Sequence, residues 1–474
     1  MRAGIRPFVA ITFFGTLVAA SVALAEGPTS EMIAERLAGA IRFETVSPEN
    51  PADFRPEPFV AHEAYLRATY PRVFESLALE HVNEHTMLFE WKGSDDTLGP
   101  ALFMSHTDVV PVSEAAAEQW SQPPYGGVIA DGYVWGRGAL DVKTGVILWL
   151  EAVDALLAEG VQPSRTIYLA FGHDEEIGGN YGAKLVAELL KERGVRLAIL
   201  FDEGGFMLDG HPLVPDRVAA AIMTAEKAYM NVKLRARGVS GHSSMPPLST
   251  AIGKLSRAIA KVEANPMPTR FAMPVREMLE AAAPHQPFST RFAMNNLWLM
   301  GPLVKRSFMK DDLNRALLRT SFAVTLVSGG VKSNVIPELA EATVNVRILP
   351  GDTPDDVLAH LEDAIDDPEI EIVGERWGMS APAASASGPA FQLAKDAVLA
   401  EIPDAVVLPG LVPGATDTRH FGEVADEILR FVPMQLEVTD SSGAHGRDER
   451  IAVEHLARSV RIATGMVRRA AAGE

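Results

Sequence analysis

The sequence predicts an α/β fold, a mixed β-sheet flanked by helices, into which an α+β domain is inserted. Short apolar runs at residues 101–105, 166–170 and 197–201 each end in polar or acidic residues, as buried strands do where an open α/β sheet binds its ligands. Helical segments separate these runs, which gives the alternation of strand and helix expected for this fold class. From residue 226 the pattern changes to strands with one polar face, and the alternation returns after residue 350.

Composition sets the outer limits on function. The chain has 474 residues, enough for two or three domains with ample cores. Its net charge of −19 disfavours nucleic acid and acidic membrane surfaces as general partners. The sequence contains no cysteine, so disulfides and thiolate ligands are excluded, and any metal must be held by histidine and carboxylate groups.

The first 25 residues have the pattern of a secretory signal peptide. Arg2 and Arg6 precede an apolar run from Phe8 to Leu24, and Ala23-Leu24-Ala25 supplies a small-x-small cleavage site. We therefore expect residues 1–25 to be removed and the protein to be periplasmic or secreted. The apolar run is also just long enough to span a bilayer, so an uncleaved membrane anchor stays open.

The mature chain begins with helices that lead to the first candidate site residues. A capped amphipathic helix near residue 30 and a helix around residues 61–78 precede two strands, the second of which ends in His106-Thr107-Asp108. Two positions apart on a strand end, His106 and Asp108 point the same way, which suits a metal ligand and its neighbour. Taken alone, the same pattern is typical of an ordinary surface strand end.

A glycine-rich stretch brings in the next acidic candidate. Gly136-Arg137-Gly138 is followed by Asp141, which precedes an apolar helix at residues 146–158. Glycine at these positions indicates close approach of the backbone. Asp141 can serve there either as an ordinary helix N-cap or as a bridging metal ligand.

The acidic triplet Asp174-Glu175-Glu176 follows the apolar strand at residues 166–170. Carboxylates this close raise one another's pKa and cost stability unless a cation or a shared proton compensates them. An isolated acidic triplet is more often the start of a helix. Because Asp202 ends the following strand, three successive strand ends now carry His106, Glu175 with Glu176, and Asp202, and a metal centre is the simplest explanation.

These motifs together resemble the M20 family of co-catalytic zinc peptidases and aminoacylases. The order, the residue types and the intervals all match, from about residue 30 to the C-terminus. The Asp-Glu-Gly-Gly form of the last motif and a long insertion resemble the branch that contains carboxypeptidase S and secreted N-acyl amino acid hydrolase/synthases. The matching motifs are His106-Thr107-Asp108, Gly136 to Lys143, Gly172-His173-Asp174-Glu175-Glu176 and Asp202-Glu203-Gly204-Gly205.

The resemblance implies a di-zinc aminopeptidase/carboxypeptidase-like catalytic domain. It implies two divalent metal ions, zinc by preference, with manganese or cobalt able to substitute. Carried onto this sequence, the ligands are His106 and Asp202 for one ion, Glu176 and His445 for the other, and Asp141 as the bridge. His445 lies in a glycine-rich approach at residues 441–446, and His420 is a weaker competitor for its position.

The same resemblance separates two supporting roles from the ligands. Asp108 would orient His106 through its second ring nitrogen and raise its basicity. Glu175 would be the general base that activates a water lying between the two metals and later passes the proton to the leaving nitrogen.

The inserted region is expected to be a lid and dimerisation domain. The resemblance places His242 as a donor to the tetrahedral oxyanion, reaching the active site of the partner subunit. Asn334 and Arg347 match positions that bind the substrate's carboxylate or acyl oxygens, and a guanidinium suits a terminal carboxylate. Residues 265–320 are expected to shape the lid or the dimer contact. The expected domains are residues 26–225 and 351–474 for the catalytic domain and 226–350 for the lid.

The sequence thus predicts a hydrolase that cleaves an amide bond adjacent to a free carboxylate, acting on a small peptide or an N-acyl amino acid, with no nucleic-acid partner and as a homodimer through the lid. Two alternatives stay open. One is an N-acyl amino acid synthase/hydrolase acting on lipidated substrates. The other is a catalytically silent solute-binding protein of the same fold, although Glu175 would then have no task.

Overall fold

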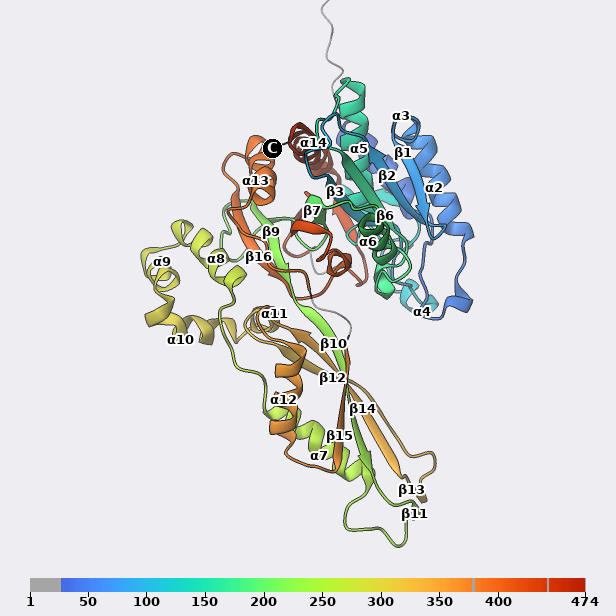
Figure 1. Cartoon of the computed structure of the whole chain (residues 1–474), viewed down its shortest axis with the longest axis vertical. Helices are drawn as coiled ribbons and strands as arrows, with labels where there is room; N and C mark the ends of the chain where they lie inside the picture. Colours follow the sequence, from blue (N-terminus) through green and yellow to red (C-terminus); the bar gives the residue numbers. More distant parts are fainter. Residues whose placement is uncertain (1–26, 377–379, 441–442, 474) are drawn as a thin grey trace, which may run out of the picture.

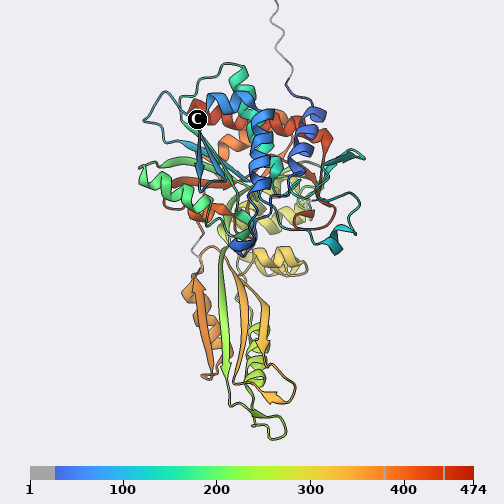
Figure 2. The same ribbon diagram turned by 90° about the vertical axis from the view of Figure 1, so that its right-hand side faces the viewer.

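A head domain and a long lid make up the protein, as seen in a computed structural model that describes residues 27–376, 380–440 and 443–473. The lid projects from the head and is narrow when seen from the side (Figures 1 and 2). The expected signal peptide, residues 1–25, lies outside the described residues. Within the described ranges, no helix is long and apolar enough to cross a membrane.

The head domain is built on a 10-stranded sheet. In spatial order its strands are β1 (Ala78–Val82), β2 (Thr86–Trp91), β6 (Ile167–Gly172), β3 (Ala101–His106), β7 (Leu197–Asp202), β17 (Ala425–Arg430), β9 (Ala219–Glu226), β8 (Met207–Asp209) and β18 (Gln435–Glu437), and β16 (Val406–Val412) pairs with β9. The pairs β3–β6, β3–β7 and β7–β17 are parallel, whereas β1–β2 and β2–β6 are antiparallel. The predicted mixed sheet is therefore confirmed.

The central strands β3 and β6 are buried along their whole length because helices cover both faces of the sheet. In β3, Phe103 packs against Trp149 and Phe201 on one face, while Leu102 and Met104 face a second cluster on the other. The first face is covered by α1 (Ser30–Ile41), α5 (Lys143–Ala158), α13 (Pro389–Glu401) and α14 (Leu456–Ala472), and the second by α6 (Ala183–Glu192).

A separate three-stranded sheet joins two distant parts of the chain. Its strands are β4 (Val128–Ala130), β5 (Tyr133–Trp135) and β19 (Arg450–Ala452). Because β5 leads into the glycine-rich stretch and β19 follows the segment of His445, this pairing sets both segments beside each other. Other helices of the head within the described ranges are α2 (Glu57–Thr69), α3 (Pro71–Ser76) and α4 (Glu114–Ala117), and short 3-10 turns include η1 (Pro51–Asp53), η2 (Glu175–Ile177), η4 (Asp417–His420) and η6 (Val453–His455).

The lid is a four-stranded antiparallel sheet with two helices packed on one face. Its strands run in the order β12 (Ser321–Gly329), β14 (Leu339–Ile348), β10 (Ala228–Arg237) and β15 (Ile370–Arg376), and its helices are α7 (Ala251–Ala264) and α12 (Pro354–Ile365). A two-stranded ribbon, β11 (Gly241–His242) with β13 (Val335–Ile336), forms the end farthest from the head (Figure 1). The strand β10 follows β9 after a single residue, which links the lid directly to the head sheet.

The lid is longer in sequence than the expected range of residues 226–350. Val357, Leu361 and Ile370 belong to the lid core, and β15 pairs with β10 over its whole length. The chain therefore returns to the head only after residue 376. An amphipathic helix followed by an alternating strand suits either domain, so the local pattern could not place this boundary.

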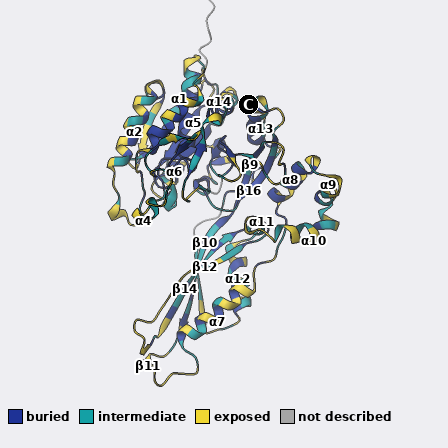
Figure 3. Ribbon diagram, turned by 180° about the vertical axis from the view of Figure 1, so that it is seen from behind, coloured by how far each residue is buried: buried dark blue, intermediate teal, exposed yellow. Residues whose placement is uncertain are grey.

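Residues 265–320 also lie in a different place from the expected one. They form α8 (Met273–Ala282), η3 (Ala283–His285), α9 (Phe288–Asn295), α10 (Leu297–Phe308) and α11 (Asp312–Leu317). Contacts of α8 with β16 and β9 attach this helical unit to the edge of the head sheet, and its core includes Ala225 and Leu411 from those strands. Figure 3, coloured by burial, shows α9 and α10 standing at the side of the molecule with much exposed surface.

Candidate metal centre

Neighbouring parallel strands bring the candidate ligands to one edge of the sheet. His106 is the last residue of β3 and pairs in register with Gly172, the last residue of β6. The acidic residues 174–176 follow β6. Asp202 is the last residue of β7, the other neighbour of β3, and Glu203 follows it. Because the three strands are parallel, their carboxyl ends meet at this edge, where α/β sheets place their ligands.

His106 is held at the centre of the site by Asp108. The histidine is almost fully buried, with 1% of its surface exposed. Its Nδ1 lies 3.0 Å from the backbone oxygen of Asp108 and 3.3 Å from the Oδ1 of that residue. The Asp108 carboxylate also accepts the backbone N–H groups of Glu175 and Glu176, each at 3.2 Å. Asp108 therefore fixes the orientation of His106 and anchors the acidic loop beside it.

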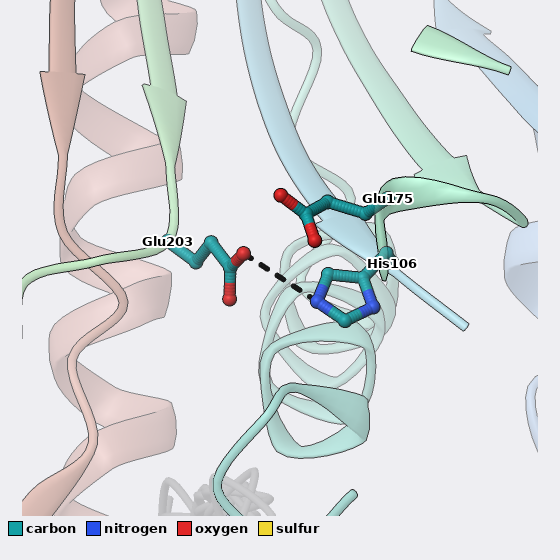
Figure 4. A group of neighbouring side chains, drawn as sticks. All are labelled: His106, Glu175 and Glu203. Atoms are coloured by element: carbon teal, nitrogen blue, oxygen red, sulfur yellow. Dashed lines mark ion pairs between the residues drawn. The ribbon is translucent and has the colours of Figure 1, made fainter. Parts of the chain in front are cut away.

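Two groups of potential ligand atoms share His106. One contains His106, Glu175 and Glu203, and the other His106, Asp141 and Glu176, and within each group the ligand atoms lie within 4.8 Å of one another. Figure 4 shows the first group, in which His106 Nε2 lies 3.4 Å from Glu203 Oε1. His106 Nε2 also lies 3.1 Å from Asp141 Oδ1.

His445 completes the second group from the far end of the sequence. Its Nε2 lies 2.9 Å from Asp141 Oδ2 and 3.0 Å from Glu176 Oε2. Asp141 thus directs one carboxylate oxygen toward His106 and the other toward His445, as a ligand shared by two ions must. His420, the weaker competitor, instead lies with its Nε2 3.0 Å from the backbone oxygen of Gly178 and joins neither group among the described residues.

The charges of this site call for cations. Desolvation and the neighbouring charge of Asp141 raise the pKa of Glu203 to about 8, and desolvation with the charge of Glu203 raises the pKa of Glu175. Hydrogen bonds to Asp141 and Glu176 raise the pKa of His445 to about 10. Glu176 Oε1 is buried without a hydrogen-bond partner. Bound protons thus reduce the repulsion among these carboxylates, and divalent ions would reduce it more strongly. The set of imidazole and carboxylate donors fits zinc, manganese or cobalt.

Glu203, and not the expected Asp202, lies in one of the two groups of potential ligand atoms. Among the described residues, neither ligand group contains Asp202. Successive residues at the end of a strand point to opposite sides, and Asp202 pairs in register with Arg430, which forms a buried ion pair with Glu226. Desolvation raises the pKa of Asp202 to about 6 in these surroundings. The motif offered two adjacent acids, and only the geometry distinguishes them.

Glu449 and Arg137 support the site and were missed by the sequence analysis. The fully buried Glu449 carboxylate accepts backbone N–H groups of Gly138, Leu140 and Asp141 at 2.6–3.0 Å. It pairs with Arg137 at 2.6 Å, and Arg137 also donates to the backbone oxygen of Gly446 at 3.0 Å. The pair therefore ties the loop of Asp141 to the segment of His445. No motif pointed to this role, because a lone glutamate resembles any other.

The lid residues divide into two sets. Arg347, on β14 near the head, lies over the ring of Tyr229 at 4.7 Å and is close enough to Glu175 for their charges to interact. His242 and Asn334 lie on the exposed ribbon at the other end of the lid, where the backbone N–H of Ser243 donates to the Asn334 oxygen. Arg347 is thus within range of the charge of Glu175 in the same chain, whereas β11, the strand that contains His242, lies at the end of the lid farthest from the head (Figure 1).

An α/β head with a lid and a centre of shared histidine and carboxylate ligands defines a metal-dependent hydrolase. The chain belongs to the peptidase family M20/M25/M40, whose sequence pattern matches residues 102–469. It is 36% identical over 435 residues to the mouse N-fatty-acyl-amino acid synthase/hydrolase PM20D1, a match that covers 90% of this chain and 86% of that protein. It is 37% identical to the probable carboxypeptidase S-like 2 of Dictyostelium discoideum, with 89% and 82% covered.

A solved structure confirms the fold class. The M20 family metallo-carboxypeptidase of Sulfolobus solfataricus superimposes with a TM-score of 0.67 at 17% sequence identity, covering 93% of this chain and 99% of that chain. The predicted family membership and the predicted architecture are thus both confirmed.

Replacement of Glu203 should remove one metal ion. We expect Glu203→Gln to bind about one divalent ion per chain where the wild type binds about two, because a zinc centre that loses one of its few protein ligands loses affinity. Metal content after gel filtration, measured by mass spectrometry, checks this. Asp202→Asn is the matched control and should keep both ions. If Asp202→Asn loses the ion and Glu203→Gln keeps it, the original assignment of Asp202 is restored.

Proposed function

We propose that the protein hydrolyses an amide bond next to a free carboxylate, in a small peptide or an N-acyl amino acid. The observation that carries the proposal is the pair of ligand groups that share His106, with Glu175 beside them. The proposed ligands are His106 and Glu203 for one divalent ion, Glu176 and His445 for the other, and Asp141 for both. When bound, such ions polarise a substrate carbonyl and lower the pKa of water.

Glu175 is the proposed general base. Its carboxylate lies within 4.8 Å of ligand atoms of His106 and Glu203. Glu175 is therefore next to the reacting centre, but it is not one of the proposed ligands of either ion. In that position it takes a proton from the attacking water and delivers it to the leaving nitrogen. Asp108 contributes by holding His106 Nδ1, which leaves Nε2 directed into the centre.

A cationic wall beside the acidic centre fits a substrate with a free carboxylate. Arg347 and Arg419 lie close enough for their charges to interact, and burial together with this repulsion lowers the pKa of Arg347. Lys227 is near both Arg347 and Arg319, and burial with these charges lowers its pKa to about 8. A carboxylate bound between such groups would relieve their repulsion, and the fork of Arg347 can hold both of its oxygens.

We place His242 and Asn334 in the site of the partner protomer. The strand β14 alone covers Leu339–Ile348, so Arg347 and the ribbon that carries Asn334 are separated by roughly 25 Å or more at about 3.3 Å per residue. One chain cannot bring both to one substrate in this arrangement. The edge strand β12, with Leu326 and Val327 exposed, offers a surface for the lid-to-lid homodimer that would do so.

The identity of the acyl group separates two forms of the proposal. The mouse relative is named for N-fatty-acyl-amino acids and the Dictyostelium relative for carboxypeptidase S, so both a lipidated N-acyl amino acid and a peptide are reasonable substrates, and synthesis as well as hydrolysis belongs to the first class. A silent solute-binding protein is disfavoured because it would not require Glu175. Action outside the cytoplasm is proposed from the signal-peptide pattern of residues 1–25.

Loss of the Glu175 carboxylate should abolish turnover and spare the metals. We expect Glu175→Gln to lower kcat by about 10²–10⁴-fold, the range for removal of a general base, with about two ions still bound. The assay uses apo protein titrated with zinc, manganese or cobalt and a panel of short-chain and long-chain N-acyl amino acids beside dipeptides. Glu188→Gln, an exposed change on α6, is the control. Full activity in Glu175→Gln would exclude it as the base, and loss of metal would make it a ligand.

Replacement of Arg347 should erase recognition of the substrate carboxylate. We expect Arg347→Gln to lower kcat/KM by about 10- to 100-fold for the free acid, the equivalent of one charged hydrogen bond, and to leave the already slow turnover of the matching carboxamide unchanged. Arg237→Gln, an exposed change on β10, should behave as the wild type. An equal loss for acid and carboxamide would show that Arg347 does not read the carboxylate.

Mixed dimers test the placement of His242. His242→Ala should lower kcat by about 10²–10³-fold, as removal of an oxyanion donor does. Mixing His242→Ala with Glu175→Gln should restore about a quarter of wild-type activity, because half of the dimers become mixed and each has one complete site. Activity is measured after the two proteins are mixed and allowed to exchange subunits, with exchange confirmed by a tag on one of them. If exchanged dimers remain inactive, His242 does not serve the partner's site.

A further inference from the structure

The helix α10 has apolar residues on the face that should be polar. Its inner face, Leu297, Val304 and Phe308, packs on the core of the helical unit, where the rings of Phe308 and Phe271 lie 6.3 Å apart. Its outer face carries Trp298 and Leu303, which are 83% and 59% exposed. A helix that covers a core normally presents polar residues outward. The inner contacts attach α10 to the core, so the exposed apolar side chains on its outer face are not needed for this attachment.

The neighbouring helix α9 extends this apolar surface. Phe288 is 74% exposed, and its ring stacks on that of Phe292, which is also exposed, with centroids 6.4 Å apart. Because α9 packs against α10, the exposed apolar residues of both helices gather in one region of the surface, and these two helices stand at the side of the molecule (Figures 1 and 3). We call this region the outer apolar face, and it consists of Phe288, Phe292, Trp298, Leu299 and Leu303. Single exposed apolar residues are common, but a contiguous set marks a binding surface.

The charge around this face is opposite to that of the whole chain. Residues 288–319 contain six lysine and arginine residues but only two aspartates and no glutamate, whereas the chain as a whole has a net charge of −19. Arg291 on α9, Arg306 on α10 and Lys310, two residues after α10, are all exposed. Aromatic and leucine side chains flanked by exposed basic residues are typical of helices that lie in the interface of an anionic membrane. Acidic residues elsewhere matter little, because salt screens charges beyond about 8 Å.

We propose that the outer apolar face binds the surface of a bilayer that contains anionic phospholipid. Phe288, Trp298 and Leu303 would enter the boundary between headgroups and acyl chains, and Arg291 and Arg306 would pair with phosphate groups. A second copy of the chain fits less well, because a symmetric contact would bring two faces with the same excess of basic residues together. The proposal concerns where the protein is held, and it does not depend on which substrate the metal centre accepts.

Vesicle binding by variants of the outer apolar face tests the proposal. The mature chain from Glu26, which includes every described residue, is sedimented with vesicles of phosphatidylcholine alone or with phosphatidylglycerol added. We expect the wild type to bind the anionic vesicles and to be released by salt, and Trp298→Ser/Leu303→Ser to bind at least about tenfold more weakly. Arg291→Glu/Arg306→Glu should lose the preference for phosphatidylglycerol. Val60→Ser, an exposed apolar change on α2, is the control and should bind as the wild type.

Hydrolysis of a soluble short-chain substrate, whichever member of the panel is cleaved, together with the circular dichroism spectrum, verifies that each variant is folded. The proposal is overturned if the folded Trp298→Ser/Leu303→Ser variant binds anionic vesicles as tightly as the wild type, or if the wild type does not bind them. It is also overturned if the wild type ignores vesicles and instead forms a dimer that the same pair of substitutions dissociates, since the face would then be a protein interface.

Discussion

Repulsion among carboxylates gathered at one edge of the head sheet is the constraint on which the rest of the structure depends. Asp141, Glu175, Glu176 and Glu203 lie around a single buried histidine, and their mutual repulsion is strong where water is scarce. Without cations the site retains protons, as the raised pKa of Glu203 indicates. Folding must therefore hold these groups together against their charge, and the binding of divalent metal would offset this repulsion and stabilise the fold.

Two further carboxylates hold the acidic segments in place, and both are stabilised by hydrogen bonds from backbone N–H groups. Asp108 accepts the N–H groups of the acidic loop that follows β6, and Glu449 accepts those of the loop that ends at Asp141. Each thus joins segments that are distant in sequence and sets them at ligand distance from each other. Arg137 adds a counter-charge for Glu449, because a fully buried carboxylate needs both hydrogen bonds and a partner. Carboxylates thus appear both among the candidate ligands and among the supports, and the supporting carboxylates differ in being bound by backbone N–H groups.

The sequence predicted the parts of the site that depend on strand ends. A continuous apolar run indicates a buried strand, so the sequence alone could place the polar groups after β3, β6 and β7 at one edge of the sheet. The choice between Asp202 and Glu203 needed the direction of the side chains at the end of β7, which a two-residue motif does not reveal. Glu449 carries no motif, since its role comes from a pairing of β5 with β19 across the chain. The end of the lid could not be placed from the sequence, because the local patterns of α12 and β15 are compatible with either domain.

Local charge, and not the total, decides what this acidic chain can bind. The same net charge of −19 covers a metal centre of clustered carboxylates, a wall with Arg347, Lys227 and Arg419 beside it, and a basic helical unit at the edge of the head. Fields from exposed charges decay within about 8 Å at physiological salt, so the exposed basic residues of the helical unit act almost independently of the acidic surface elsewhere on the chain. The expectation that acidic membranes are unsuitable as general partners therefore applies to the chain as a whole, whereas a helical face of opposite charge can still be attracted to them.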